Sequence, residues 1–176
     1  MAGFSYPSIP VEIMDDSLYY FGRAVEVSQG HVFIGNQYNV EHRDDITVAF
    51  FVADWVWSIP LVLGVPVQVA IIINQILYFL ITGYLLHIIL SRLRVQPKYV
   101  PVGVGFILLF VYWFLARPVA MQVVFPLFLL WLVSLFYFIC YPLEKRAQVG
   151  LALVSALSLY VYTYLTQITV VSSGIG

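Results

Sequence analysis

The sequence predicts an all-α integral membrane protein with about five transmembrane helices, and two observations lead to that class. First, 62% of the 176 residues are apolar and only 10% are charged, whereas soluble domains have roughly 45–50% apolar and about 25% charged residues. Second, the apolar residues lie in long runs that short polar loops separate. A chain of this length cannot hide so much apolar surface from water. Soluble, disordered and nucleic-acid-binding classes are therefore excluded.

Residues 1–45 form an acidic, polar segment that we expect to lie outside the bilayer. This segment holds seven acidic and two basic residues, whereas residues 46–176 hold two acidic and six basic ones. Residues 24–28 alternate apolar and polar side chains, residues 29 and 30 favour a turn, and residues 31–34 continue in an extended pattern. That arrangement predicts a short β-hairpin. Because a two-stranded hairpin is marginal alone in water, it would have to rest on another part of the molecule.

The first two predicted spans lie within residues 46–90, a run interrupted only by Asp54 and a few amides. A span needs about 20 residues, so this run is long enough for two helices. Gly64 and Pro66 mark the break between them, because proline starts a helix well and ends one badly. The predicted spans are residues 46–64 and 66–91. A re-entrant arrangement of this region remains an alternative.

Three further spans are predicted at residues 100–117, 119–141 and 149–171, so that the bundle covers residues 46–171 and residues 172–176 form a C-terminal stub. Basic residues fill the loop at 91–98 and the loop at 142–148. With five spans and the N-terminus inside, seven of the eight Lys and Arg residues fall on the inner face and only Arg117 falls outside. This bias predicts an N-in, C-out orientation.

Asp54 is the acidic residue within the predicted spans, about 10 Å from the inner end of the first one. An ionisable group at that depth is costly and marks a candidate site with a partner. In an antiparallel hairpin, residue 54 lies level with Asn74 and Gln75, and Ser58 shares its helix face. We therefore predict an intramembrane polar cluster of these four residues. It would be either a proton or cation site or a hydrogen-bonded clamp between helices.

Other polar residues in or near the spans favour packing and interfacial contacts. Asn74, Tyr78 and Thr82 recur every four residues and give one helix a polar stripe, which is typical of a packing face. His87 lies near the inner end of its span, where we expect an interfacial hydrogen bond. The basic residues expected to contact lipid headgroups or partner subunits are Arg92, Arg94, Lys98 and Arg117.

The sequence contains no self-contained motif for a haem, a metal or a nucleotide, so its cofactors stay unknown. Cys140 is the single cysteine and cannot form an internal disulfide. No Cys and His residues show metal-ligand spacing, and no Gly-rich phosphate loop occurs. Aromatic residues make up 17% of the chain, which suits contacts with lipid and neighbouring helices. Structural lipids are therefore the expected bound molecules.

Three functions are compatible with these patterns. The first is a non-catalytic accessory or structural multi-pass subunit of a larger membrane complex, such as a respiratory or photosynthetic one, bound to other membrane subunits and to lipids. The second is a small ion or proton transporter or channel that uses Asp54 with Asn74 and Gln75. The third and least supported is a membrane enzyme that handles lipid or quinone. Coupled transporters usually need several ionisable groups within the spans; a single one favours the subunit.

Overall fold

The computed structural model describes residues 15–31, 33, 51–116, 119–161, 166–168 and 170–171, and these segments are helical without a strand. The all-α prediction is therefore confirmed for this part of the chain. The elements are α1 (Asp15–Ser28), α2 (Phe51–Val62), α3 (Val67–Arg92), the 3₁₀ turn η2 (Pro97–Tyr99), α4 (Val100–Ala116), α5 (Ala120–Cys140) and α6 (Lys145–Val161).

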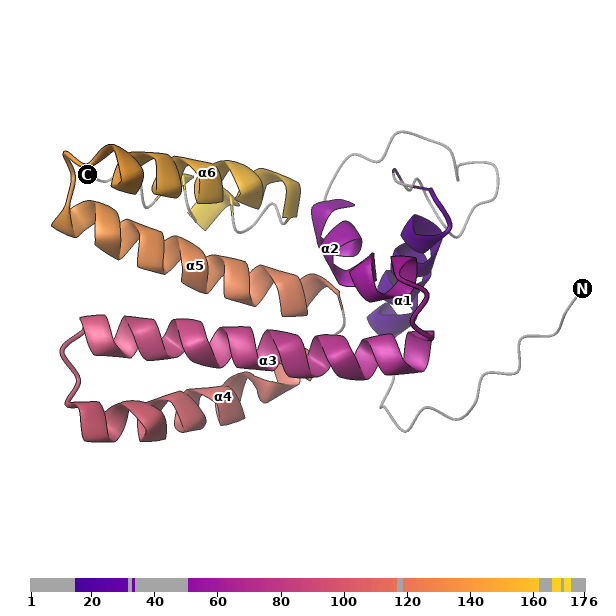
Figure 1. The fold of residues 1–176 in the computed structure, drawn as a ribbon, viewed down its shortest axis with the longest axis horizontal. Coiled ribbons are helices and arrows are strands. Elements are labelled where there is room, and N and C mark those ends of the chain that lie inside the picture. Colours follow the sequence, from indigo (N-terminus) through magenta and orange to yellow (C-terminus); the bar gives the residue numbers. More distant parts are fainter. Residues whose placement is uncertain are drawn as a thin grey trace, which may run out of the picture.

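The four long helices α3 to α6 form an up-and-down bundle, and α1 and α2 pack together at one end of it (Figure 1). α3 contacts α4 on one side and α5 on the other, and α6 packs against α5. α3 and α4 approach closely because glycine lies between them: a Cβ atom on Gly103 would be 3.0 Å from Cδ1 of Leu90. Small residues allow such close backbone contact between apolar helices.

Two hydrophobic clusters hold the molecule together. One lies at the α1–α2 end and includes Ala24 of α1, Trp57 of α2, Val123 of α5 and Val161 of α6. The other lies between α3 and α5, around Leu85, Leu86, Ile89 and Leu129. The first cluster joins α1 and α2 to the start of α5 and the end of α6. It therefore fixes the N-terminal helices at the end of the bundle where α3 and α5 begin.

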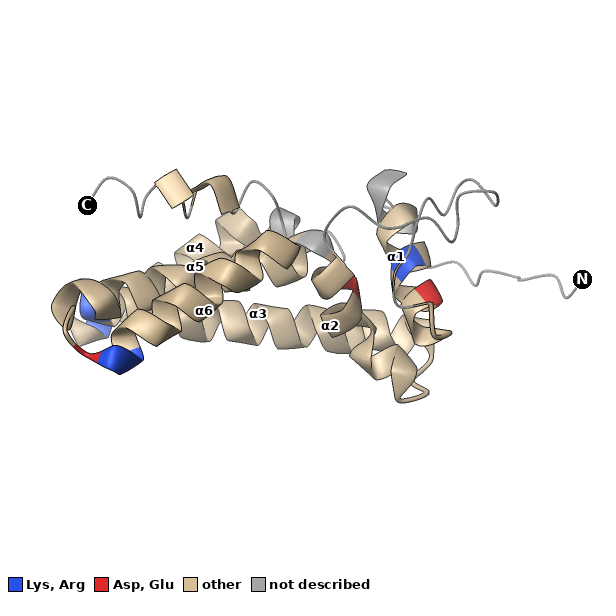
Figure 2. Ribbon diagram, turned by 90° about the horizontal axis from the view of Figure 1, so that it is seen from above, with Lys and Arg blue, Asp and Glu red and all other residues tan. Residues whose placement is uncertain are grey.

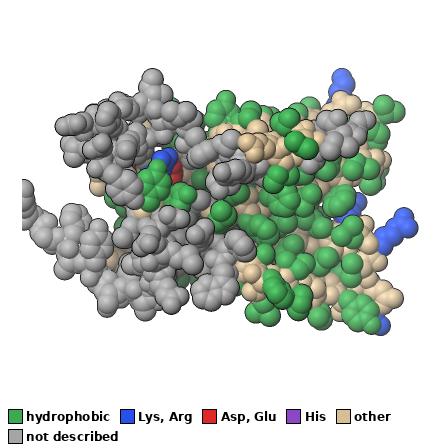
Figure 3. Space-filling model, turned by 180° about the vertical axis from the view of Figure 1, so that it is seen from behind, with side chains coloured by type: hydrophobic (Ala, Val, Ile, Leu, Met, Phe, Trp, Pro, Cys, Tyr) green, Lys and Arg blue, Asp and Glu red, His purple; other side chains and the backbone are tan. Residues whose placement is uncertain are grey.

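Two helices are long and apolar enough to cross a membrane: α3, and residues Met121–Cys140 of α5. Phe51–Val62 and Pro97–Tyr112 are shorter apolar helices. Only 33% of the apolar window of α3 and 28% of that of α5 is buried, unlike a core helix of a soluble protein, which is mostly enclosed. Many hydrophobic side chains are consequently exposed, and they spread over the face of the bundle that Figure 3 shows.

The predicted β-hairpin is wrong, because residues 24–28 belong to helix α1. The alternation of residues 24–28 competes with the helical spacing of Tyr20, Phe21 and Ala24, which places these three residues on one face of α1. These three side chains pack into the cluster at the end of the bundle. Burial of one helix face outweighs a short period-two pattern. Residues 32 and 34 of the expected second strand lie outside the described residues.

The predicted span at 46–64 contains only the 12-residue α2 among its described residues. At 1.5 Å per residue α2 is about 18 Å long, shorter than the ~30 Å apolar core of a bilayer. It packs chiefly against α1 rather than lengthwise along α3, and Gly64, with φ of +83°, makes the turn between α2 and α3. The sequence predicts that residues 51–62 pair with the helix that follows them, as half of a helical hairpin. In the structure, α2 pairs with α1 instead.

The last predicted helix begins earlier than expected, because residues 145–148 of the charged loop form the first turn of α6. The backbone N–H groups of Ala147 and Gln148 donate to the carbonyl of Glu144. α5 ends at Cys140, before Pro142, so that only residues 141–144 separate α5 from α6.

The ends of the bundle differ in charge. Arg92, Arg94, Lys98, Lys145 and Arg146 lie where α3 ends, α4 begins and α5 turns into α6, and α1 lies at the opposite end (Figure 2). The orientation predicted from the sequence grouped Arg23 with these bases on one face. In the structure Arg23 is only 7% exposed, so it is an interior residue and not a free loop charge.

Candidate functional site

Asp54, the acidic residue singled out in the sequence, forms a buried ion pair with Arg23 of α1. Nη2 of Arg23 lies 2.7 Å from Oδ2 of Asp54, and Nε donates to the same oxygen at 2.9 Å. Asp54 is only 2% exposed. Because both groups are removed from water, neither charge would be tolerated without the other.

Arg23 is held in place by its own helix. Tyr19 lies one turn earlier, and its hydroxyl accepts a hydrogen bond of 3.1 Å from Nη1 of Arg23. The guanidinium carbon lies 5.5 Å from the centre of the Tyr19 ring, close enough for a cation–π contact. Burial opposes the charge on Arg23, but the hydrogen bond and the attraction of Asp54 outweigh it and raise the pKa of the guanidinium. Arg23 thus remains a cation.

A second set of polar contacts centres on Gln122, at the start of α5. Its Oε1 accepts a 2.7 Å hydrogen bond from the indole Nε1 of Trp57. Its Nε2 donates to Oε1 of Gln75 at 2.6 Å and to the carbonyl of Leu115 at 2.9 Å. One amide therefore ties α2, α3 and the end of α4 to α5, and Gln122 itself is 2% exposed.

The Arg23–Asp54 pair and the contacts of Gln122 with Trp57 and Gln75 together form a polar junction at the α1–α2 end of the bundle. The four residues predicted to cluster lie at this junction but do not bond to one another. Asn74 donates to the backbone carbonyl of Trp57 at 2.9 Å, and Ser58 donates to the carbonyl of Trp55. Gln75 accepts from Gln122. The expected contact of Asp54 with Asn74 or Gln75 is replaced by the pair with Arg23, because α2 packs beside α1 and not along α3.

Arg23 and Gln122 are the two central residues that sequence reasoning missed. Gln122 had a detectable signal: it is an amide near the start of a long apolar run, where an unpaired polar group is costly. Arg23 had none, since it lies in the polar N-terminal segment among acidic residues. Its pairing spans 31 residues of sequence and depends on how α1 folds back.

Four of the remaining predicted residues lie toward the other end of α3, away from the junction. His87, Arg92, Arg94 and Lys98 are exposed, and Arg117 lies outside the described residues. The polar stripe of α3 is buried: Asn74, Tyr78 and Thr82 are all enclosed by neighbouring helices. Within the segments that the structure describes, His, Cys, Asp and Glu side chains form no group of three that could hold a metal ion.

Thr82 provides a test of this packing, because its hydroxyl is fully buried without a hydrogen-bond partner. Valine has nearly the same shape and no hydroxyl, so Thr82→Val is expected to raise the free energy of unfolding by about 1 kcal/mol, since an unsatisfied buried polar group is removed. Thermal unfolding in mild detergent measures the change. Thr82→Ser, which keeps the hydroxyl and loses a methyl group, serves as the control and should destabilise the protein. A valine variant less stable than wild type would contradict this account.

The chain matches no family model, and comparisons with curated proteins and with solved structures gave no significant match. The chemistry of the junction is therefore argued from its own residues. Its carboxylate is neutralised by Arg23, and its amides and indole bond to each other. Such an arrangement joins helices together.

Proposed function

We propose that this protein is a non-catalytic, multi-pass structural subunit of a larger membrane assembly. The observation that carries the proposal is that the carboxylate of Asp54 already has a partner: it is bonded twice to Arg23. A proton or cation carrier needs an ionisable group that exchanges its partner during turnover. The buried pair instead fixes α1 to α2, as a clamp does.

The outer surface of the bundle supports contact with lipid and with other apolar helices. α3 exposes Ile72, Ile76 and Leu80, each more than half accessible, and α4 exposes Phe106 and Leu109 at 61% and 75%. A soluble monomer rarely leaves apolar patches of this extent open to water. Hydrocarbon tails, or the helices of partner subunits, would cover them at no cost in desolvation.

We further propose a membrane topology in which α3 to α6 cross the bilayer and α2 enters it only partway. α4 has 17 residues, at the lower limit of about 17–25 for a span. α6 also has 17 residues, but it begins with the basic Lys145 and Arg146, so its apolar part starts after them. The basic loops then lie on the inner face, and α1 lies on the opposite face. This arrangement replaces the five-span, N-in prediction. It leaves the non-spanning α2 beside α1, where Asp54 meets Arg23.

Cysteine labelling tests this topology. In a Cys140→Ser background, Gln96→Cys reports the basic end and Gln29→Cys reports the end of α1; both positions are exposed. With a membrane-impermeant maleimide on intact cells, we expect Gln29→Cys to react and Gln96→Cys to react only after the membrane is opened. Reaction of both from the same face would contradict the four-span arrangement and restore the N-in orientation.

The subunit role is tested by the size of the particle that contains this chain. After extraction in mild detergent, native gel electrophoresis is expected to show it in a heteromeric complex much larger than the 20.0 kDa chain. Purified chain in liposomes is expected to carry no proton or cation flux. Migration as a monomer or small homo-oligomer together with flux that Asp54→Asn abolishes would overturn the proposal in favour of transport.

A further inference from the structure

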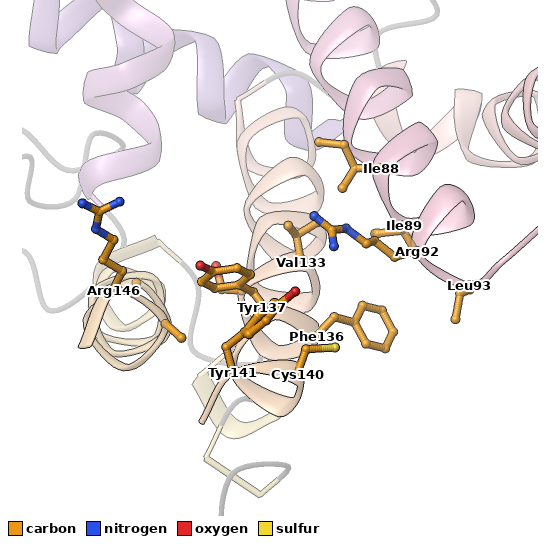
Figure 4. A pocket seen from close by; sticks show the side chains of 13 residues that line it. Ile88, Ile89, Arg92, Leu93, Val133, Phe136, Tyr137, Cys140, Tyr141 and Arg146 are labelled. Atoms are coloured by element: carbon orange, nitrogen blue, oxygen red, sulfur yellow. The ribbon is translucent and has the colours of Figure 1, made fainter. Parts of the chain in front are cut away.

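A cavity at the basic end of the bundle is distinct from the junction at the α1–α2 end. Its volume is about 360 Å³, within the range of roughly 300–1,000 Å³ typical of ligand pockets. It lies where α3 ends, α5 ends and α6 begins, and Figure 4 shows the side chains around it. None of the polar junction residues lines it.

The walls of the cavity combine two cations with an apolar surface. Arg92 from α3 and Arg146 from α6 both line it, and in Figure 4 they lie on either side of Tyr137. Ile89 and Phe136 are among the apolar side chains between them. Two guanidinium groups from different helices on one cavity give it a positive charge that favours an anionic ligand.

Neither arginine has an acidic partner within the described segments, where the ion pairs are Arg23 with Asp54 and His31 with Glu26. Glu144 is the carboxylate of the neighbouring loop, and it accepts a 2.8 Å hydrogen bond from the hydroxyl of Tyr137. Ser134, also in the wall, donates to a backbone carbonyl of its own helix. The charged donors left for a ligand are therefore the two guanidiniums.

We propose that this cavity binds the phosphate headgroup of an anionic phospholipid, with its acyl chains along the apolar wall. Arginine pairs with phosphate oxygens through two parallel N–H donors, and the cavity lies where apolar helices meet basic loops, the depth of a headgroup. An inorganic phosphate ion would gain nothing from the apolar wall. The proposal rests on the membrane location proposed above, but not on the subunit role.

Lipid titration of the purified chain in detergent tests the site, with native mass spectrometry as the readout. We expect phosphatidylglycerol to bind more tightly than phosphatidylcholine with the same acyl chains, and inorganic phosphate not to compete at millimolar concentration. The double variant Arg92→Gln/Arg146→Gln should weaken phosphatidylglycerol binding roughly 10- to 30-fold, about fivefold per arginine.

The matched control removes the same charge from the same end of the bundle. Arg94 and Lys145 are neighbours of the two arginines in sequence but do not line the cavity, so Arg94→Gln/Lys145→Gln should change the affinity less than threefold. If the two double variants lost the same affinity for phosphatidylglycerol, the effect would come from general surface charge, and the proposed site would be wrong. If inorganic phosphate competed with phosphatidylglycerol, the proposal that a lipid occupies the cavity would be wrong.

Cys140 gives a second readout that does not depend on affinity measurements. It is the single cysteine of the chain, it is exposed, and it lines the cavity. Phosphatidylglycerol is expected to slow its alkylation by a maleimide in the wild type and in the control variant, but not in Arg92→Gln/Arg146→Gln. Equal alkylation rates with and without lipid in the wild type would contradict the site. Both readouts use the isolated chain, so a failure here is separable from a failure of the subunit proposal.

Discussion

Replacing Arg23 with methionine is expected to lower the free energy of unfolding by about 3–5 kcal/mol, because it leaves the carboxylate of Asp54 buried without its counter-charge. Asp54 is 2% exposed, and both the Nε and the Nη2 groups that contact its Oδ2 belong to the same guanidinium. Reversible unfolding of the purified protein in mixed micelles measures the loss.

Two further variants decide whether the ion pair causes that loss. The double variant Arg23→Met/Asp54→Leu removes both charges and is expected to regain most of the lost stability, since a buried pair and a well-packed apolar pair are often similar in free energy. Arg94→Met removes an exposed arginine and should change the stability by less than about 0.5 kcal/mol. A loss in Arg23→Met no larger than that of Arg94→Met would show that the pair is solvated.

Gln122→Met is expected to be the next most damaging change, with a loss of about 2–4 kcal/mol. The side chain keeps its length, but the indole N–H of Trp57 and the carbonyl of Leu115 lose a partner, and each unsatisfied buried group costs about 1–3 kcal/mol. Thermal and denaturant unfolding, with tryptophan fluorescence as one probe, measure this loss.

A glutamine outside the junction supplies the control for Gln122→Met. Gln96 is exposed and makes no side-chain cap to the turn that follows it, so Gln96→Met should leave the stability nearly unchanged. Trp57→Phe removes the indole N–H that donates to Gln122, so it breaks the same hydrogen bond from the donor side. Combined with Gln122→Met, it should cost less than the two single losses added together, because the two residues share that bond. Strict additivity would show that the Trp57–Gln122 bond contributes nothing.

The α1–α2 pair explains why the sequence missed the central contact of the molecule. The residue opposite Asp54 was inferred from a helical hairpin that turned at Gly64, and that turn does form. The inference failed because α2 packs on α1 instead of running along α3. Sequence periodicity reports which face of a helix is apolar, but it does not report which of several apolar neighbours covers that face.

The sequence by itself determined the helical class and the course of the longest helix. Apolar runs of about 20 residues satisfy their backbone hydrogen bonds only within themselves, so α3 runs from Val67 to Arg92 where the composition favoured a helix at 66–91. Only the tertiary structure decided that α1 is a helix, that Arg23 neutralises Asp54, and that Arg92 and Arg146 share a cavity. The ion pair and the cavity bring together residues 31 or more positions apart, and they depend on how whole helices pack, which no local pattern of side chains specifies.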